Sequence, residues 1–370
     1  MTLLLLQELS IKIESMHSNS NIEIRVLTDN DSLWDQIDSV DTYSLYHKRE
    51  WKNLIEETFG NFGYYLAASD SGILIDVLPL FLIKNPIMGK KLVSTPYEGC
   101  SGGFSSSNVE ARHKIISEIL KNARQLNVKY VEIRSLSPIE ELKQYGFLEA
   151  TPFVIFEVPL INLDENFKML SANHRRNVRI AKKKRVSVVL ASRWEEMNAF
   201  YNILSDHYKT IGLPFFGRMF FKKIWCDLVV KKHASLLLAK KAQKIIGGHL
   251  LFFSGKKIVS KYSAYRKDLE CKKINASYAL FWEGVRLGIE RKCSVFNLGI
   301  TGEHNTGLLD FKTRFGADKA LVHFYSLPVS GNVPDYALYY NSFQLPKKIW
   351  KIAPYGLTNF LGQKINKWIC

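Results

Sequence analysis

The sequence predicts an α/β (α+β) fold made of two similar cores in tandem, each with a mixed β-sheet. Two observations carry this prediction. The same order of apolar strands and helices occurs twice along the chain, and each series ends in a strand–helix–strand unit, whose strands pair in parallel through a right-handed crossover. The chain has 370 residues, of which 46% are hydrophobic, so it is long enough for two domains with separate cores.

The first half shows strand-like and helix-like apolar patterns in a clear order. The runs YYLAAS and ILIDVLPLFLIK are separated by the turn sequence DSG, as in a hairpin. Farther along, Ile115, Ile119 and Ala123 recur at four-residue spacing, which predicts an amphipathic helix. The expected elements are strands at Tyr64–Ser69, Ile73–Lys84 and Lys90–Thr95, a helix at Glu110–Leu126 and a strand at Tyr130–Arg134.

The second half repeats this order. Strands are expected at Ser235–Lys240, Ile245–Ser254 and Lys257–Tyr265, followed by a helix at Asn275–Arg291 and a strand at Ser294–Leu298. Aromatic-rich helical segments precede each series, at Leu45–Thr58 in the first half and at Glu195–Lys209 and Arg218–Val230 in the second. Helices therefore cover both faces of each sheet.

Several motifs give this chain a resemblance to a known family. The strand and helix order is that of a GCN5-related acetyltransferase (GNAT) core, and two such cores in one chain resemble the FemABX family. The motifs that carry the resemblance are Ser171–Lys183 (SANHRRNVRIAKK), Tyr262-Ser263-Ala264, Asn275-Ala276, Trp282 and Gly307–Gly316 (GLLDFKTRFG). The exopolysaccharide-associated FemAB-like proteins look most similar, because no heptad run for a coiled-coil arm interrupts residues 160–320.

The resemblance implies both an organisation and an activity. We expect GNAT-like domains at 21–159 and 160–320, followed by residues 321–370 with a strand that returns to the first domain and a basic, aromatic tail. The implied enzyme is an aminoacyl or acyl transferase. It moves an acyl group from aminoacyl-tRNA to an amine of a phosphorylated or lipid-linked cell-envelope precursor of peptidoglycan or polysaccharide. No cofactor is expected, because the donor is itself a substrate.

Positive charge is concentrated in one helical segment. The chain carries a formal charge of +16, and no acid occurs between Asn166 and Trp194. Arg175, Arg176, Arg179 and Lys183 lie there, at spacings that place several of them along one helix face. Because Arg binds phosphate through paired hydrogen bonds, we expect this segment to bind a phosphorylated substrate or tRNA. A basic face that only contacts solvent is the alternative.

The donor is inferred from a missing motif. GNAT enzymes bind coenzyme A on a glycine-rich turn before the helix that follows the central strand, yet Arg266–Ala276 (RKDLECKKINA) has no glycine. This favours aminoacyl-tRNA over acyl-CoA. An acyl-CoA-dependent N-acyltransferase with a different coenzyme A site remains an alternative, as does a non-catalytic anion- or nucleic-acid-binding protein on the same scaffold.

The Gly247-Gly248 pair interrupts an otherwise apolar strand. Glycine there marks a bulge or a close backbone approach, and exposed N–H groups at such a bulge would stabilise an acyl oxyanion. Simple close packing of the following helix is the alternative.

Lys312 is the leading catalytic candidate. It lies between Phe311 and Phe315, which restrict its solvation, and the resemblance points to the same residue. It would bind a phosphate or stabilise the tetrahedral oxyanion; a lysine that only extends its charge to solvent from an amphipathic helix is the alternative. Asp310 and Glu303 are the candidate proton acceptors. The remaining candidates for substrate binding are Tyr262, Tyr265 and Asn275.

The sequence also argues against several other classes. The nine histidines show no metal-ligand spacing, the five cysteines contain no CxxC pair, and no phosphate-binding or dinucleotide-binding glycine motif occurs. No apolar run reaches the length of a membrane span, and the first residues do not form a signal peptide. We expect a cytoplasmic protein.

The C-terminal tail combines basic and aromatic residues. After Asp335 the chain has five lysines and no acid, interleaved with Trp, Tyr and Phe. This pattern predicts peripheral contact with the inner face of the cytoplasmic membrane. A tail packed on the first domain is the alternative.

Overall fold

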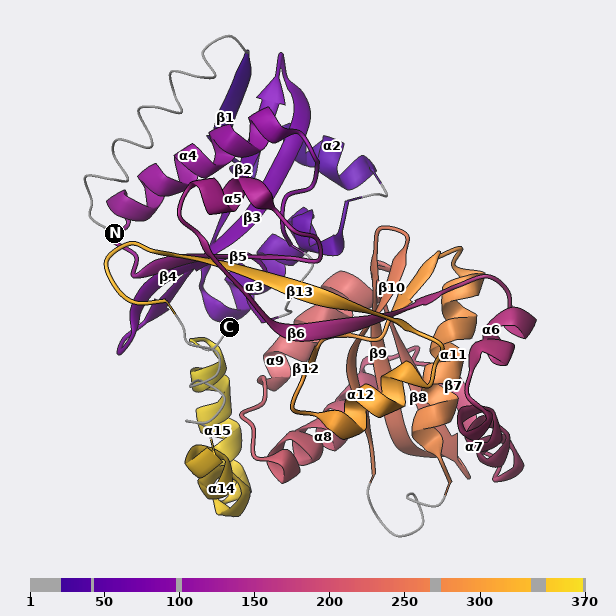
Figure 1. Ribbon diagram of the computed structural model, residues 1–370. Helices are drawn as coiled ribbons and strands as arrows, with labels where there is room; N and C mark the ends of the chain where they lie inside the picture. The colour runs from indigo at the N-terminus through magenta and orange to yellow at the C-terminus, as the bar shows by residue number, and fades with distance from the viewer. Residues whose placement is uncertain (1–20, 41–42, 98–101, 267–273, 334–343, 369–370) are drawn as a thin grey trace. The chain divides into compact units, whose positions relative to one another are not determined.

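The computed structural model describes residues 21–40, 43–97, 102–266, 274–333 and 344–368. The chain forms two compact units (Figure 1). The first unit comprises the chain up to Pro152 together with Leu321–Asp335, and the second comprises Phe153–Ala320 together with the C-terminal helices. The division after Pro152 lies within a long strand, seven residues before the boundary expected from the sequence at Pro159.

The first unit has a mixed sheet with the strand order β1-β2-β3-β4-β5-β13. Its elements are β1 (Ile22–Val26), α2 (Leu33–Ser39), the 3-10 helix η1 (Leu45–His47), α3 (Arg49–Phe59), β2 (Phe62–Asp70), β3 (Ile73–Asn85), β4 (Gly89–Val93), α4 (Val109–Gln125), β5 (Tyr130–Ser135) and α5 (Glu140–Gln144). Neighbouring strands pair antiparallel except β4 and β5, which are parallel and joined through α4. The β2–β3 hairpin turns at Ser71 and Gly72, whose φ angles are 50° and 80°, as a tight hairpin requires.

Alternating side chains place two apolar layers on the faces of this sheet. Leu66 and Leu78 pack with Ile115 and Ile119 of α4 on one face. Tyr65, next to Leu66 along β2, points the other way and packs against Trp34 at 5.2 Å between ring centroids. Because side chains alternate along a strand, one run of apolar residues serves both layers.

The second unit repeats this arrangement with the strand order β6-β11-β10-β9-β8-β7, and β12 also pairs with β6. In chain order the elements from Leu148 to Pro328 are β6 (Leu148–Pro159), α6 (Leu163–Met169), α7 (Ala172–Lys183), β7 (Ser187–Leu190), α8 (Trp194–Ile211), α9 (Arg218–Lys223), the π-helix η2 (Ile224–Val229), β8 (Ala234–Lys241), β9 (Lys244–Ser254), β10 (Lys257–Tyr265), α11 (Ala276–Glu290), β11 (Val295–Asn297), β12 (Thr301–Gly302), α12 (Thr306–Thr313) and β13 (Asp318–Pro328). All but β13 form the second unit, and β13 pairs in the sheet of the first. Here β10 and β11 are the parallel pair, joined through α11. The order of elements predicted from the sequence is therefore present in both halves.

Each unit receives its last strand from the other half of the chain. Strand β13 follows the second unit's helices but pairs with β5 of the first unit, with Tyr325 opposite Ile133. Strand β6 follows α5 of the first unit. Its residues Glu157–Pro159 pair antiparallel with β11 of the second unit, and Phe153 and Val154 pair antiparallel with β12. The chain thus passes to the second unit after Pro152, returns to the first after Ala320, and enters the second again after Asp335 (Figure 1).

The C-terminal helices α14 (Gln344–Ile352) and α15 (Tyr355–Asn366) belong to the second unit. Both pack on α8, where Tyr355 Oη donates a hydrogen bond to Ser205 Oγ at 2.7 Å and Lys209 Nζ donates one to the Ala353 carbonyl. Gly212, which ends α8 with φ 81°, leaves room for the Lys347 carbonyl. The described residues 321–333 join the first unit, whereas the tail packs on the second unit rather than on the first domain.

Candidate functional site

Lys312 lies at the C-terminal end of α12 and is buried, with 3% of its surface exposed. Its ammonium group donates hydrogen bonds to the carbonyl of Gly299 at 2.6 Å and to the hydroxyl of Thr301 at 2.7 Å, with a longer bond to the Ile300 carbonyl at 3.4 Å. The cation therefore points into the protein, where a low dielectric strengthens its field. It holds the short segment Gly299–Thr301, which leads from β11 into the first residue of β12.

A second set of hydrogen bonds also fixes the backbone of this segment. Gly299 has φ 81°, and its N–H donates to Asn297 Oδ1 at 2.8 Å. The Asn297 amide in turn donates to Glu157 on β6 at 3.1 Å, and Lys257 donates to the same carboxylate oxygen at 2.8 Å. A side chain at Gly299 would approach the Ser260 carbonyl to 2.8 Å, so only glycine fits this turn.

His249 is a buried polar residue of this region that the sequence analysis did not single out. It lies on β9, fully buried, with Nε2 2.8 Å from Ser260 Oγ and its ring centroid 4.4 Å from that of Phe281 on α11. Burial and then the positive charge of Lys312 lower the pKa of His249 to about 3, so the imidazole is neutral at neutral pH. The sequence signal was a lone histidine within the apolar run IIGGHLLFFS.

The two carboxylates expected near Lys312 lie on the outside. Asp310, with 60% of its side chain exposed, accepts a hydrogen bond from Arg314 Nε at 2.8 Å. Glu303 is 62% exposed and lies 3.8 Å from Lys319 Nζ. Neither carboxylate is among the described hydrogen-bond acceptors of Lys312, so a base role for either stays a prediction.

Gly247 and Gly248 have packing functions on β9. A Cβ atom at Gly248 would lie 2.5 Å from the Phe200 ring of α8, and one at Gly247 would lie 2.9 Å from the Ala264 carbonyl. Both glycines are paired with β8 and with β10, and a register shift against β8 occurs just before Gly247. Gly248 thus permits close packing of α8, and Gly247 permits close approach of the β10 backbone. An oxyanion role for their N–H groups stays a prediction.

The basic helix α7 is anchored to α12 through His174. Ser171 caps the helix by accepting the His174 N–H at 3.3 Å, and the buried His174 ring has Nε2 3.0 Å from the Phe311 carbonyl. Aromatic rings of Tyr278, Phe311 and Phe315 surround it, with centroids 4.7 to 5.1 Å away. Burial lowers the pKa of His174, which keeps it neutral beside the basic residues. Helix α7 and Lys312 are therefore held on one connected part of the second unit.

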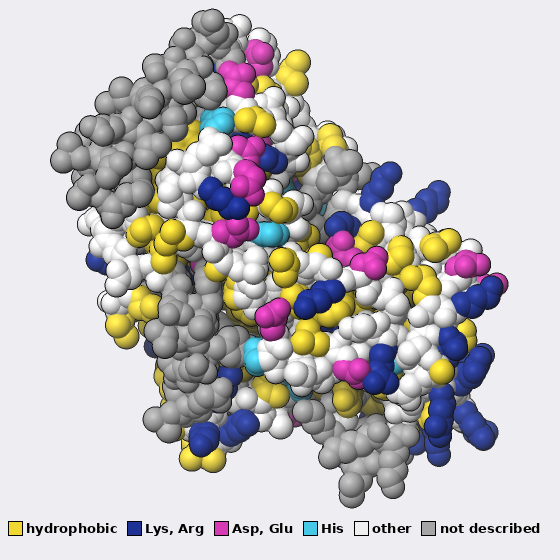
Figure 2. Space-filling model, in the orientation of Figure 1, with side chains coloured by type: hydrophobic (Ala, Val, Ile, Leu, Met, Phe, Trp, Pro, Cys, Tyr) yellow, Lys and Arg dark blue, Asp and Glu magenta, His cyan; other side chains and the backbone are white. Residues whose placement is uncertain are grey.

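The four basic residues predicted to bind an anion do not share one environment. Arg175 donates to the carbonyls of Lys168 and Leu170, so its guanidinium is used to hold the end of α6. Arg176, Arg179 and Lys183 are exposed, and Arg179 lies 5.4 Å from the centre of the Phe167 ring. Figure 2 shows a dense group of basic side chains over α7. Within the described residues, Arg176, Arg179 and Lys183 have no acidic partner, so they are free to meet an anion.

Of the other substrate-binding candidates, Asn275 contacts α7. It opens α11 with φ 55°, and its amide donates to Asn177 at 3.0 Å. Tyr262 is 5% exposed and lies among Phe215, Phe216 and Phe221, which is a core environment. Tyr265 is half-buried at the end of β10 beside Gly247. The glycine-free turn that argued against acyl-CoA is mostly residues 267–273, which lie outside the described residues.

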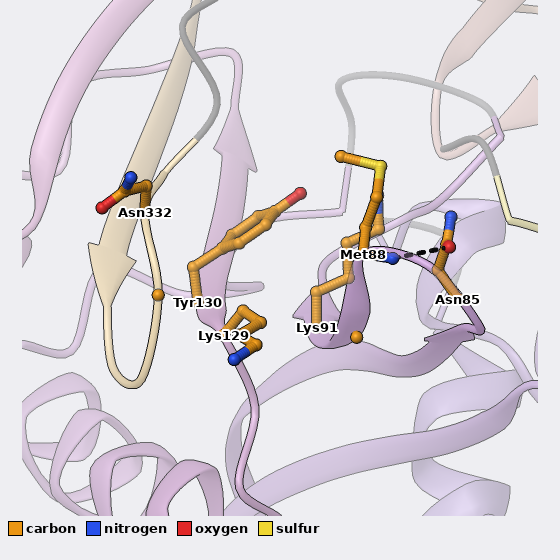
Figure 3. A pocket seen from close by; sticks show the side chains of 8 residues that line it. Asn85, Met88, Lys91, Lys129, Tyr130 and Asn332 are labelled. Carbon is orange, nitrogen blue, oxygen red and sulfur yellow. Dashed lines mark hydrogen bonds between the residues drawn. The ribbon is translucent and has the colours of Figure 1, made fainter.

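The first unit contains a cavity of about 300 Å³ (Figure 3). Its lining includes Lys91, Lys129 and Tyr130, and none of the predicted site residues. Among the residues that the structure describes, no group of three or more His, Cys, Asp or Glu side chains is arranged to hold a metal ion. No helix within the described ranges combines the length and apolar content needed to cross a membrane.

Comparison with known proteins identifies the family. The pattern of the FemAB-like family, described as peptidoglycan biosynthesis/recognition, matches residues 84–308, more than half of the chain. The chain belongs to the FemAB-like family. The match includes α7, His249 and Glu303 and ends before Asp310 and Lys312. No curated protein matches this FemAB-like chain significantly.

Solved structures with the same fold support the architecture of this FemAB-like protein. FemX superposes with a TM-score of 0.70 at 15% identity, covering 88% of this chain and 100% of its own. The C-terminal domain of a putative lysylphosphatidylglycerol synthetase from Agrobacterium fabrum has a TM-score of 0.57 at 13% identity, covering 85% and 96%. L-PGS from Bacillus licheniformis has a TM-score of 0.53 at 14% identity, covering 80% and 96%. The predicted fold of two tandem GNAT-like cores with mixed sheets is confirmed.

Proposed function

We propose that this FemAB-like protein is an aminoacyltransferase that moves an acyl group from aminoacyl-tRNA to an amine of a phosphorylated or lipid-linked cell-envelope precursor. In this reaction the amine nitrogen attacks the ester carbonyl. The new C–N bond forms, the C–O bond to the tRNA ribose breaks, and the amine proton passes to the departing ribose oxygen through a base or water. The family assignment supports a transferase of cell-wall synthesis; donor and acceptor are the proposal.

The observation that carries this function is the pairing of an exposed basic helix with a buried cation. Helix α7 presents Arg176, Arg179 and Lys183 to solvent, and His174 joins this helix to α12, which carries Lys312. Phosphates of tRNA or of the precursor would bind the exposed guanidinium groups. Lys312 would position Gly299–Thr301 and add positive charge where the tetrahedral oxyanion develops.

A transfer assay tests the proposal. The full chain is incubated with radiolabelled aminoacyl-tRNA, and in parallel with labelled acetyl-CoA, together with sugar-nucleotide and lipid-linked amine acceptors. We expect label in the acceptor from aminoacyl-tRNA alone. Transfer from acetyl-CoA alone would replace the donor, and binding of tRNA without transfer to any acceptor would favour a non-catalytic binding protein.

Removing the exposed guanidinium groups of α7 is expected to weaken tRNA binding in a salt-dependent way. For the double variant Arg176→Ala/Arg179→Ala we expect an affinity loss of about 10- to 100-fold, because each lost charged hydrogen bond costs roughly 1 kcal/mol or more. The slope of log affinity against log salt should fall by about 1.5, as for two lost phosphate contacts. Filter binding across a salt series measures both quantities.

The matched control is Lys84→Ala, an exposed basic residue of the first unit. It should change neither affinity nor slope. Arg175→Ala serves as a second comparison, because Arg175 is held by the carbonyls of Lys168 and Leu170 and should affect the melting temperature more than the salt slope. An unchanged slope in the double variant would remove α7 from the proposed site.

A further inference from the structure

The tail helices of the second unit have one face packed on the protein and another exposed. On α15 the side chains of Thr358 and Asn366 are buried, and Leu361 and Ile365 are half-buried. These positions recur at three- and four-residue spacing, so they form one side of the helix. Together with the Tyr355–Ser205 hydrogen bond, they fix which side of α15 faces outward.

The outward side of α15 is apolar and basic. Leu357, Phe360 and Lys364 follow one another at spacings of three and four residues; Leu357 is 49% exposed and Phe360 58% exposed. Lys364 Nζ lies 4.6 Å from the centre of the Phe360 ring, so charge and aromatic surface are adjacent. Exposing the apolar side chains of this row to water is unfavourable in free energy.

Helix α14 also exposes apolar side chains next to lysine. Ile349 is 56% exposed and Ile352 is 84% exposed, and Lys348 lies one helical turn before Ile352. Figure 2 shows lysine and apolar side chains next to one another on the part of the surface formed by α14. Both helices thus expose large aliphatic or aromatic groups beside lysine.

The charges of the tail decide which kind of partner fits the exposed face of α14 and α15. Residues 336–370 contain five lysines and no acid. A second copy of the same surface would bring lysines against lysines, and a nucleic acid would leave the exposed Ile, Leu and Phe side chains without apolar contacts. An anionic bilayer surface satisfies both groups, because phosphates meet the lysines while apolar side chains enter the boundary of the acyl chains.

We propose that the outward face of α14 and α15 binds the surface of an anionic lipid bilayer. Ile349, Ile352, Leu357 and Phe360 enter the headgroup–acyl boundary, and the exposed lysines contact lipid phosphates. This binding is peripheral and requires no rearrangement of α8, since the contacts of the tail with α8 use its other face. It goes beyond the proposed transfer reaction, which assigns no role to these side chains.

The experiment is vesicle sedimentation of the full chain with phosphatidylglycerol-rich vesicles and with purely zwitterionic vesicles. We expect binding to the anionic vesicles that weakens as salt is raised. The variant Leu357→Ser/Phe360→Ser should bind them at least about 10-fold more weakly, because it loses two of the four apolar side chains that enter the bilayer. The variant Lys348→Gln/Lys364→Gln should lose its preference for anionic lipid.

The matched control is Ile73→Ser/Ile87→Ser, which removes two exposed apolar side chains, 68% and 90% exposed, from the first unit. It should bind vesicles like the wild type.

Equal binding by the Leu357→Ser/Phe360→Ser variant and the wild type would overturn the proposal, and so would absence of binding by the wild type. A dimer that dissociates in that variant, seen by sedimentation velocity, would show that a second copy occupies the face. Transfer to a water-soluble acceptor is unchanged in all three variants if only the membrane contact is affected, which separates this proposal from the proposed function.

Discussion

Replacing Lys312 with methionine is expected to lower the transfer rate by about 10²- to 10³-fold, the range seen when one preorganised donor of an oxyanion site is lost. The variant keeps the apolar stem and removes the ammonium group. The carbonyl of Gly299 and the hydroxyl of Thr301 then lose their donor, so the segment Gly299–Thr301 loses both its anchor and its positive field. We expect kcat to fall far more than KM rises, as measured in steady-state assays with saturating aminoacyl-tRNA.

A buried lysine elsewhere provides the control. Lys52 in the first unit is also 3% exposed, and it donates to Asp29 at 2.7 Å and Glu56 at 2.8 Å. Lys52→Met should lower the free energy of unfolding by about 1–3 kcal/mol and leave kcat of the folded protein unchanged. Lys312→Arg, which keeps the charge, should recover part of the rate. If Lys312→Met loses stability like Lys52→Met but turns over normally, Lys312 has only a structural role.

The free energy of unfolding is expected to fall steeply as pH drops below about 6.5. His47 in the first unit and His249 in the second are buried and neutral, and burial lowers the pKa of His47 to about 4 and that of His249 to about 3. The unfolded chain therefore takes up these two protons before the folded chain does. Each histidine contributes stability that is fully present above its unfolded pKa and is lost on acidification, up to about 1.4 kcal/mol per pH unit.

Urea unfolding at a series of pH values between 7 and 4.5 measures this loss. His47→Gln and His249→Gln should each flatten the pH dependence, whatever they do to stability at pH 7. Asp76 offers a comparison of opposite sign, because burial raises the pKa of its carboxyl group. Its folded state takes up a proton first, so its contribution grows as pH falls, and Asp76→Asn should steepen the acid loss. Parallel curves for wild type and both histidine variants would contradict the assignment.

The order of secondary structure was predictable because the apolar periods are strong in both halves. The hairpin at Ser71-Gly72 and the helix α4 follow directly from local sequence. The division after Pro152 was not predictable, since it falls inside β6, which is one continuous strand. The packing of the tail on α8 was not predictable either. It depends on Gly212 at the end of α8, where a side chain would clash with the Lys347 carbonyl, and the sequence of the tail carries no information about that position.

The candidate site was predictable in its charges and less so in its geometry. Helix α7 and the burial of Lys312 were indicated by a run of basic residues and by flanking aromatic residues. That Arg175 would bind the carbonyls of Lys168 and Leu170 could not be read from sequence, because it depends on the angle between α6 and α7. His249 was missed because a single histidine in an apolar strand is equally typical of core packing.

The exchange of final strands has a consequence for folding during synthesis. The first unit lacks its last strand β13 until the ribosome has added Phe153–Pro328, a further 176 residues. At about 5–20 residues per second, β5 keeps an unpaired edge for roughly 9 to 35 s. Unpaired edges recruit other strands, so the nascent chain has a window in which a chaperone, or a neighbouring nascent chain, competes with its own C-terminal half. Slowing translation after β6 should therefore reduce the soluble yield, and a co-expressed peptide with the sequence of β13 should restore it.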